Sequence, residues 1–153
     1  MRSIGSVLIM GFLLSCGQGK SDILKEPFKL HLAGTWRLLK GTLIEKGDTV
    51  VTDYTKNTSF IKVINNTHFA FLQHDLSKGK IAPAVYVSGG GRFTLKDSLY
   101  TEHLEYCSDR EWEGNDFTFM ITIKNDTLTQ SGVEKIDRAG INRINIEEYV
   151  RIK

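Results

Sequence analysis

The chain has 153 residues, with 20 basic and 18 acidic side chains and a formal net charge of +2. Even after removal of an N-terminal signal segment, the remaining length suits a single domain with a hydrophobic core. No block of basic residues occurs, so the chain lacks the electrostatic footprint of nucleic-acid-binding proteins. The histidine and cysteine spacings form no local metal-ligand set, and the sequence predicts no metal and no other cofactor.

The first residues have the pattern of an export signal. Arg2 supplies a short positive region, and residues 4–14 form an apolar run that is too short to span a bilayer. The run ends in Leu13-Leu14-Ser15-Cys16, which resembles the lipobox of bacterial lipoproteins. The resemblance implies cleavage before Cys16 and acylation of this cysteine, which would give a stable membrane anchor. An ordinary secretory signal with a chance cysteine is the alternative.

This resemblance also implies an organisation and a location. The expected parts are a signal peptide (1–15), a lipidated cysteine with a tether (16–30), and a folded domain (31–153). The protein would be anchored in the bacterial cell envelope. Gly17 after the cysteine is compatible with sorting to the outer membrane, and the face of that membrane is left open.

From residue 31 onwards the sequence has the pattern of short β-strands separated by turns. Pairs of turn-forming residues join three hairpins, at Asn65-Asn66, Lys96-Asp97 and Asn125-Asp126. The predicted strands are 34–45, 49–52, 59–64, 67–73, 90–95, 98–106, 117–124, 127–131 and 141–153. Consecutive antiparallel strands with edges to hide predict an all-β fold, an antiparallel up-and-down β-barrel of about eight to ten strands. A β-sandwich is the alternative.

Gly34-Thr35-Trp36, at the start of the first predicted strand, resembles the Gly-x-Trp signature of lipocalins. In lipocalins the indole closes one end of the barrel and packs against an arginine near the last strand, which implies Arg151 here, or else Arg143. A wider set of residues resembles a group of lipocalin-like bacterial lipoproteins of unknown function: Gly34–Trp36, Asn66–Phe69, Gly89–Gly91 and Tyr100–Glu102. The resemblance implies a calycin-type barrel and supplies no reaction.

The hairpin at residues 85–107 carries the main candidate site. With Lys96-Asp97 as its turn, Phe93 would face Tyr100 and Gly91 would face Glu102. Alternation along the strands then predicts an inward face that includes Phe93, Gly91, Tyr100, Glu102, Leu104 and Tyr106. Glu102 is therefore predicted to be an inward carboxylate. It would anchor a ligand, act as an acid/base group, or make a structural hydrogen bond.

His68 is the second candidate. A turn at Asn65-Asn66 would pair His68 with Val63, but both faces of this hairpin are apolar, so its direction is left open. An inward His68 could form an acid/base pair with Glu102, and a histidine in the core or at the rim is the alternative. The glycines Gly89–Gly91 lie in a strand with no helix after them, which predicts a bulge or bend and excludes a phosphate loop.

The sequence thus predicts a lipid-anchored envelope lipoprotein whose barrel binds a small, largely apolar ligand. The candidate ligand contacts are Glu102, Tyr100, Tyr106, Phe93 and His68, with Gly34, Trp36 and Arg151 at the closed barrel end. The expected interior residues are Trp36, Leu38, Phe93, Tyr100, Leu104, Ile121 and Ile123.

Two other functions are left open. One is a small barrel enzyme with Glu102, alone or with His68, as acid/base, although no nucleophile elbow or nucleotide motif occurs and no catalytic residue is assigned. The other is a packed barrel that binds a protein partner through its surface and the loop at residues 108–115. A cavity of about 300 Å³ or more with Glu102 exposed in it would favour a ligand.

Overall fold

The computed structural model describes residues 31–153, so the predicted signal peptide, Cys16 and the tether lie outside the described residues. The strands are β1 (Gly34–Glu45), β2 (Asp48–Asp53), β3 (Thr58–Ile64), β4 (His68–Asp75), β5 (Tyr86–Lys96), β6 (Leu99–Cys107), β7 (Asn115–Lys124), β8 (Thr127–Ile136) and β9 (Ile141–Arg151). Two single-turn 3-10 helices, η1 (Arg110–Trp112) and η2 (Asp137–Ala139), lie in the β6–β7 and β8–β9 connections. Among the described residues, no helix is long and apolar enough to cross a membrane.

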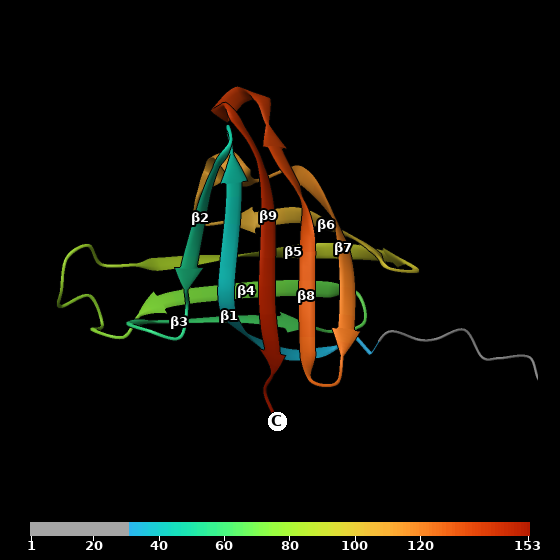
Figure 1. Ribbon diagram of the computed structural model, residues 1–153, viewed down its shortest axis with the longest axis horizontal. Coiled ribbons are helices and arrows are strands. Elements are labelled where there is room, and N and C mark those ends of the chain that lie inside the picture. The colour runs from blue at the N-terminus through green and yellow to red at the C-terminus, as the bar shows by residue number, and fades with distance from the viewer. Residues whose placement is uncertain (1–30) are drawn as a thin grey trace, which may run out of the picture.

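Eight of the strands form a closed antiparallel barrel. Strands β3 to β9 pair in chain order, and β1 closes the barrel by pairing with both β3 and β9. The remaining strand, β2, folds back on the second half of β1, past the residues that pair with β3. In Figure 1, strands β1, β2, β7, β8 and β9 form a front layer, and β3 to β6 cross behind it. The predicted up-and-down barrel is confirmed, and the closed sheet excludes the sandwich alternative.

The β5–β6 hairpin is present, but its register differs from the prediction. The turn is Asp97-Ser98 and not Lys96-Asp97, with Asp97 at a φ of 55°, a conformation that aspartate tolerates well. The register therefore shifts by two residues, and Glu102 lies opposite Phe93 instead of Gly91. Because alternate residues share a face, a shift of two leaves Glu102 on the inward face.

The three consecutive glycines of β5 lie at a β-bulge, as predicted. The register shifts between Gly90 and Gly91, which leaves Glu105 of β6 as the extra residue. The two backbones approach closely at this point, and a Cβ atom on Gly91 would lie 1.9 Å from the carbonyl oxygen of His103. Glycine is required here because any side chain would push β5 and β6 apart.

One end of the barrel is filled by a core around Trp36. The Trp36 indole is fully buried, and its Nε1 donates a hydrogen bond to the carbonyl oxygen of Leu32 at 2.8 Å. The guanidinium carbon of Arg151 lies 4.0 Å from the centroid of this ring. Arg151 also donates to the carbonyl oxygen of Ala33, at 2.8 Å, next to Gly34. Arg151 therefore holds the start of β1 against the end of β9, whereas Arg143 lies over a different ring, that of Trp112.

Candidate functional site

A cavity of about 670 Å³ occupies the barrel at the end away from Trp36. All nine strands contribute to its lining, together with Tyr54 after β2 and with Ser108, Asp109, Arg110 and Trp112 of the β6–β7 connection. The large apolar side chains of the lining include Leu43, Tyr54, Phe60, Phe71, Leu104, Trp112, Phe117 and Phe119. The volume lies within the range of small-molecule sites.

Lys62 and Glu102 form a buried ion pair where the cavity meets the core. The Lys62 Nζ atom lies 2.8 Å from the Glu102 Oε1 and 3.1 Å from the Gln130 Oε1. It is 3.8 Å from Oε2 of a second carboxylate, Glu147, which also accepts a hydrogen bond from the Tyr149 hydroxyl at 2.7 Å. Lys62 is 2% exposed and Glu102 is 6% exposed. Such burial of charge is tolerated because the groups are paired and hydrogen-bonded.

A second polar group lies nearer the mouth of the cavity, on β8 and β9. Glu134 accepts hydrogen bonds from the Arg143 Nε and the Asn145 Nδ2, both at 2.7 Å. The guanidinium carbon of Arg143 is 5.0 Å from the centroid of the Trp112 ring, within the range of a cation–π contact. Arg143 is therefore already neutralised by Glu134 and stacked on the wall of the cavity.

Burial and neighbouring charges have opposite effects on the pKa values of Lys62 and Glu102. Burial by itself lowers the pKa of Lys62, but Glu102 and Glu147 together outweigh it, so this pKa is raised. Burial raises the pKa of Glu102, and Lys62 offsets this effect only in part. The pKa of Tyr100 is also raised, first by burial and then by the Glu102 charge. With both carboxylates ionised, a single ammonium group is shared between two negative charges.

The predicted contacts on the central hairpin take different positions. Glu102 lines the cavity, whereas Phe93 and Tyr100 pack together beside it in the core, with ring centroids 5.1 Å apart. Tyr106 is 69% exposed, so its predicted inward position is wrong. The bulge in β6 reverses the alternation, and Cys107 lines the cavity in its place.

His68 lies on the outer surface of the barrel. The β3–β4 register is also shifted by two residues, so that Val63 pairs with Ala70 and not with His68. The His68 side chain is exposed and its Nδ1 is 2.7 Å from the Thr67 hydroxyl. His68 therefore does not meet Glu102, and the acid/base pair that an inward His68 would have formed is absent. Within residues 31–153 no group of three or more metal-ligating side chains occurs.

Sequence reasoning did not identify Lys62 and Glu147 as site residues. A signal for Lys62 exists, because it alternates with Phe60 and Ile64 on an apolar face, where a lysine indicates a buried partner. Glu147 has no such signal, because it stands beside Glu148 in a strand with polar residues on both faces. The pairing of β9 with β1 and β8 decides that Glu147 points inward.

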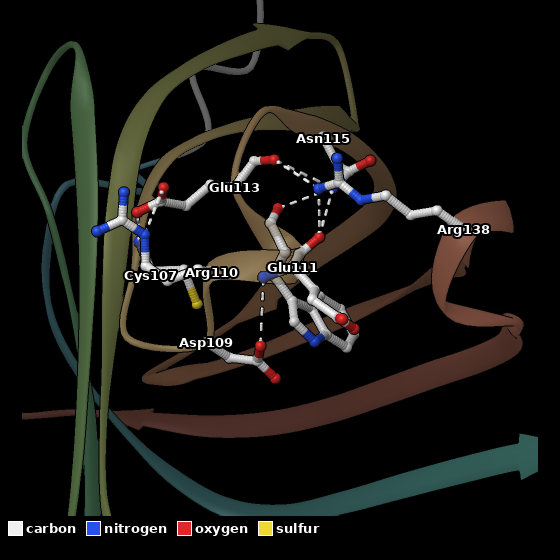
Figure 2. Close-up of polar contacts among 8 residues, drawn as sticks. Cys107, Asp109, Arg110, Glu111, Glu113, Asn115 and Arg138 are labelled. Atoms are coloured by element: carbon white, nitrogen blue, oxygen red, sulfur yellow. Dashed lines mark hydrogen bonds and ion pairs between the residues drawn. The ribbon is translucent and has the colours of Figure 1, made fainter.

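The β6–β7 connection folds over the mouth of the cavity and includes the 3-10 turn η1. The Asp109 carboxylate caps η1 by accepting a hydrogen bond from the Glu111 amide. The Nη2 atom of Arg138, in η2, donates to the carbonyl oxygens of Glu111 and Glu113 (Figure 2). This tie between the two connections places the Trp112 ring against Phe117, with centroids 5.6 Å apart.

No protein-family model matches the chain, and no curated protein matches it in sequence. The closed eight-stranded antiparallel barrel is consistent with a lipocalin-like fold. Evidence for function therefore comes from the cavity and its residues.

Proposed function

We propose that this protein binds a small molecule inside the barrel. The observation that carries the proposal is the cavity of about 670 Å³ that ends on the buried Lys62–Glu102 pair. Apolar rings on one side and hydrogen-bonding groups on the other suit a ligand with an apolar body and one polar end. Glu102 would then anchor the polar end, together with Lys62 and Glu147.

The two other functions that the sequence left open have less support. A barrel packed solid by its own side chains would have no cavity of this size. An acid/base pair of Glu102 and His68 is excluded by the outward position of His68. A ligand-binding barrel is therefore the function that this geometry supports best.

The test is native mass spectrometry of the protein purified from its own host. We expect the wild type to retain a small molecule and Leu43→Trp, which fills the cavity from β1, to lose it. Leu72→Trp, on the outer face of β4, is the matched control and should retain it. A neutral apolar dye, N-phenyl-1-naphthylamine, whose fluorescence rises on binding, should bind to the wild type and to Leu72→Trp but not to Leu43→Trp. If neither a retained molecule nor the dye distinguishes Leu43→Trp from the wild type, the proposal fails.

We further propose that Cys16 is acylated and anchors this barrel in the bacterial cell envelope, at the outer membrane. The support is the lipobox-like Leu13–Cys16 after a short apolar run. Metabolic labelling with an alkyne fatty acid should label the wild type and Cys107→Ser but not Cys16→Ser. Labelling of Cys16→Ser equal to that of the wild type would contradict the anchor.

A further inference from the structure

Acidic side chains outnumber basic side chains in the lining of the cavity. Four carboxylates line it, from Glu102, Asp109, Glu134 and Glu147, against three basic groups, from Lys62, Arg110 and Arg143. The cavity therefore carries an excess of negative charge, although the chain as a whole has a net charge of +2. A negative cavity in a slightly basic protein favours a ligand that brings positive charge.

Each basic group of the lining already has an acidic partner. Lys62 lies against Glu102 and Glu147, and Arg143 is bonded to Glu134. Arg110 pairs with Glu113 at 2.9 Å. An anionic ligand, such as a fatty acid, would have to break one of these pairs and leave a carboxylate without its cation, at a cost in binding.

Glu147 is the carboxylate that is best placed to receive a cation. Its side chain is 15% exposed, against 8% for that of Glu102. Its distance to the Lys62 Nζ is 3.8 Å, against 2.8 Å for Glu102, so Lys62 neutralises it less completely. Glu147 thus combines access to the cavity with an incompletely matched charge.

The apolar walls favour the same kind of ligand. Phe60 and Phe71 stack with ring centroids 6.0 Å apart, and the Tyr54 ring meets Phe60 edge-on at 5.7 Å. Trp112 and Phe117 form a second aromatic wall at the mouth. Aromatic faces attract cations and also pack against flat or apolar groups. Together, the walls and the carboxylates suit an amine with an aromatic or apolar body.

We propose that the ligand of this cavity is a cationic amine whose ammonium group binds Glu147 and Glu102 and whose apolar body packs between the aromatic walls. This inference rests on the proposed function and specifies the ligand class of the same site.

The test compares three ligands that share an indole body and differ only in the end group. Tryptamine ends in an ammonium group, tryptophol in a hydroxyl and indole-3-propionate in a carboxylate. Titration calorimetry of the purified full-length protein near pH 7 should rank them in that order. Charge-assisted hydrogen bonds predict that tryptamine binds about tenfold or more tightly than tryptophol.

Two adjacent glutamates provide the matched variants. Glu147→Gln keeps the size of the side chain and one acceptor oxygen and removes its charge, so the preference for tryptamine over tryptophol should fall about tenfold. Glu148→Gln is the control, because Glu148 is half exposed and pairs outside the barrel with Lys40 at 2.6 Å. Its ligand ranking should equal that of the wild type. Binding of the neutral dye by Glu147→Gln would show that its cavity is intact.

Several outcomes would overturn this inference while leaving the proposed function in place. These are equal binding of all three ligands, tighter binding of indole-3-propionate than of tryptamine, and equal losses in Glu147→Gln and Glu148→Gln. Failure of all three indoles to bind while the neutral dye still binds would also overturn it. If the dye fails to bind as well, the ligand-binding function falls with it.

Discussion

The Lys62 ammonium is the charge on which the interior of this barrel depends. Its removal by Lys62→Met would leave Glu102 buried without a cation, so we expect a loss of about 3–5 kcal/mol in the free energy of unfolding at pH 7. Urea denaturation would measure this loss. Lys124→Met, at the exposed end of β7, is the control and should change stability by about 0.5 kcal/mol or less. Similar losses in both variants would contradict the structural role of the pair.

The loss of stability in Lys62→Met should also depend on pH. Burial raises the pKa of Glu102 above its ordinary value of 4.5. A carboxyl with a raised pKa in the folded state favours folding at low pH and opposes it as the pH rises through that folded value. Lys62→Met raises this pKa further, because it removes the cation that partly offsets burial. The deficit of Lys62→Met relative to the wild type should therefore be smaller at pH 5 than at pH 7. A deficit independent of pH would show that a buried charge is not its cause.

At the scale of elements, the contact between η1 and η2 controls the mouth of the cavity. Arg138 is exposed and bonds only carbonyl oxygens of the neighbouring loop, so Arg138→Ala should change global stability by about 1 kcal/mol or less. The loop itself should open more often, with faster hydrogen exchange at the Trp112 and Gly114 amides, which bond to Asp109 and Leu104.

The control for this loop is Lys135, near the end of β8 and close in sequence to Arg138. Lys135→Ala removes an exposed ion pair with Asp137 that does not reach the loop, and exchange in the loop should stay at the wild-type rate. Unchanged exchange in Arg138→Ala would mean that the capping of η1 by Asp109 and the packing of Trp112 hold the loop without Arg138.

At the scale of the whole molecule, closure of the barrel depends on the contact between the first and last strands. Arg151→Ala removes the cation over Trp36 and the bonds to the segment before β1, so unfolding free energy should fall by about 1–3 kcal/mol. Guanidinium denaturation followed by tryptophan fluorescence would measure the change. Arg37→Ala, next to Trp36 but exposed, should have little effect. An equal effect of the two would contradict the closure role of Arg151.

The strand pairing and the sizes of the side chains also explain why one end of the barrel is packed and the other contains a cavity. The end around Trp36 contains the large buried side chains, including Leu38, Tyr100, Ile121 and Tyr149. At the other end, β1 leaves β3 to pair with β2, and the lining includes small residues such as Gly41. The barrel is therefore closed by its core at one end and open to a ligand at the other.

The sequence by itself determined the strands, the barrel and the inward direction of Glu102. These features follow from local rules, because turn residues mark the hairpins and alternation assigns each face even when the register is wrong by two residues. The alternation also indicated that Lys62 shares an apolar face, although it did not name a partner. The same local rules failed for Tyr106, because a bulge is a single extra residue whose position depends on how closely β5 approaches β6.

Only the tertiary structure decided what these residues do together. Lys62 and Glu102 are 40 positions apart in sequence, and Lys62 and Gln130 are 68 apart, so no local pattern relates them. Closing the sheet through β1 and β9 brings Glu147 to the same ammonium group. The charge excess of the cavity, and with it the class of ligand we propose, arises from the closure of the barrel, because closure alone determines which charged side chains share its interior.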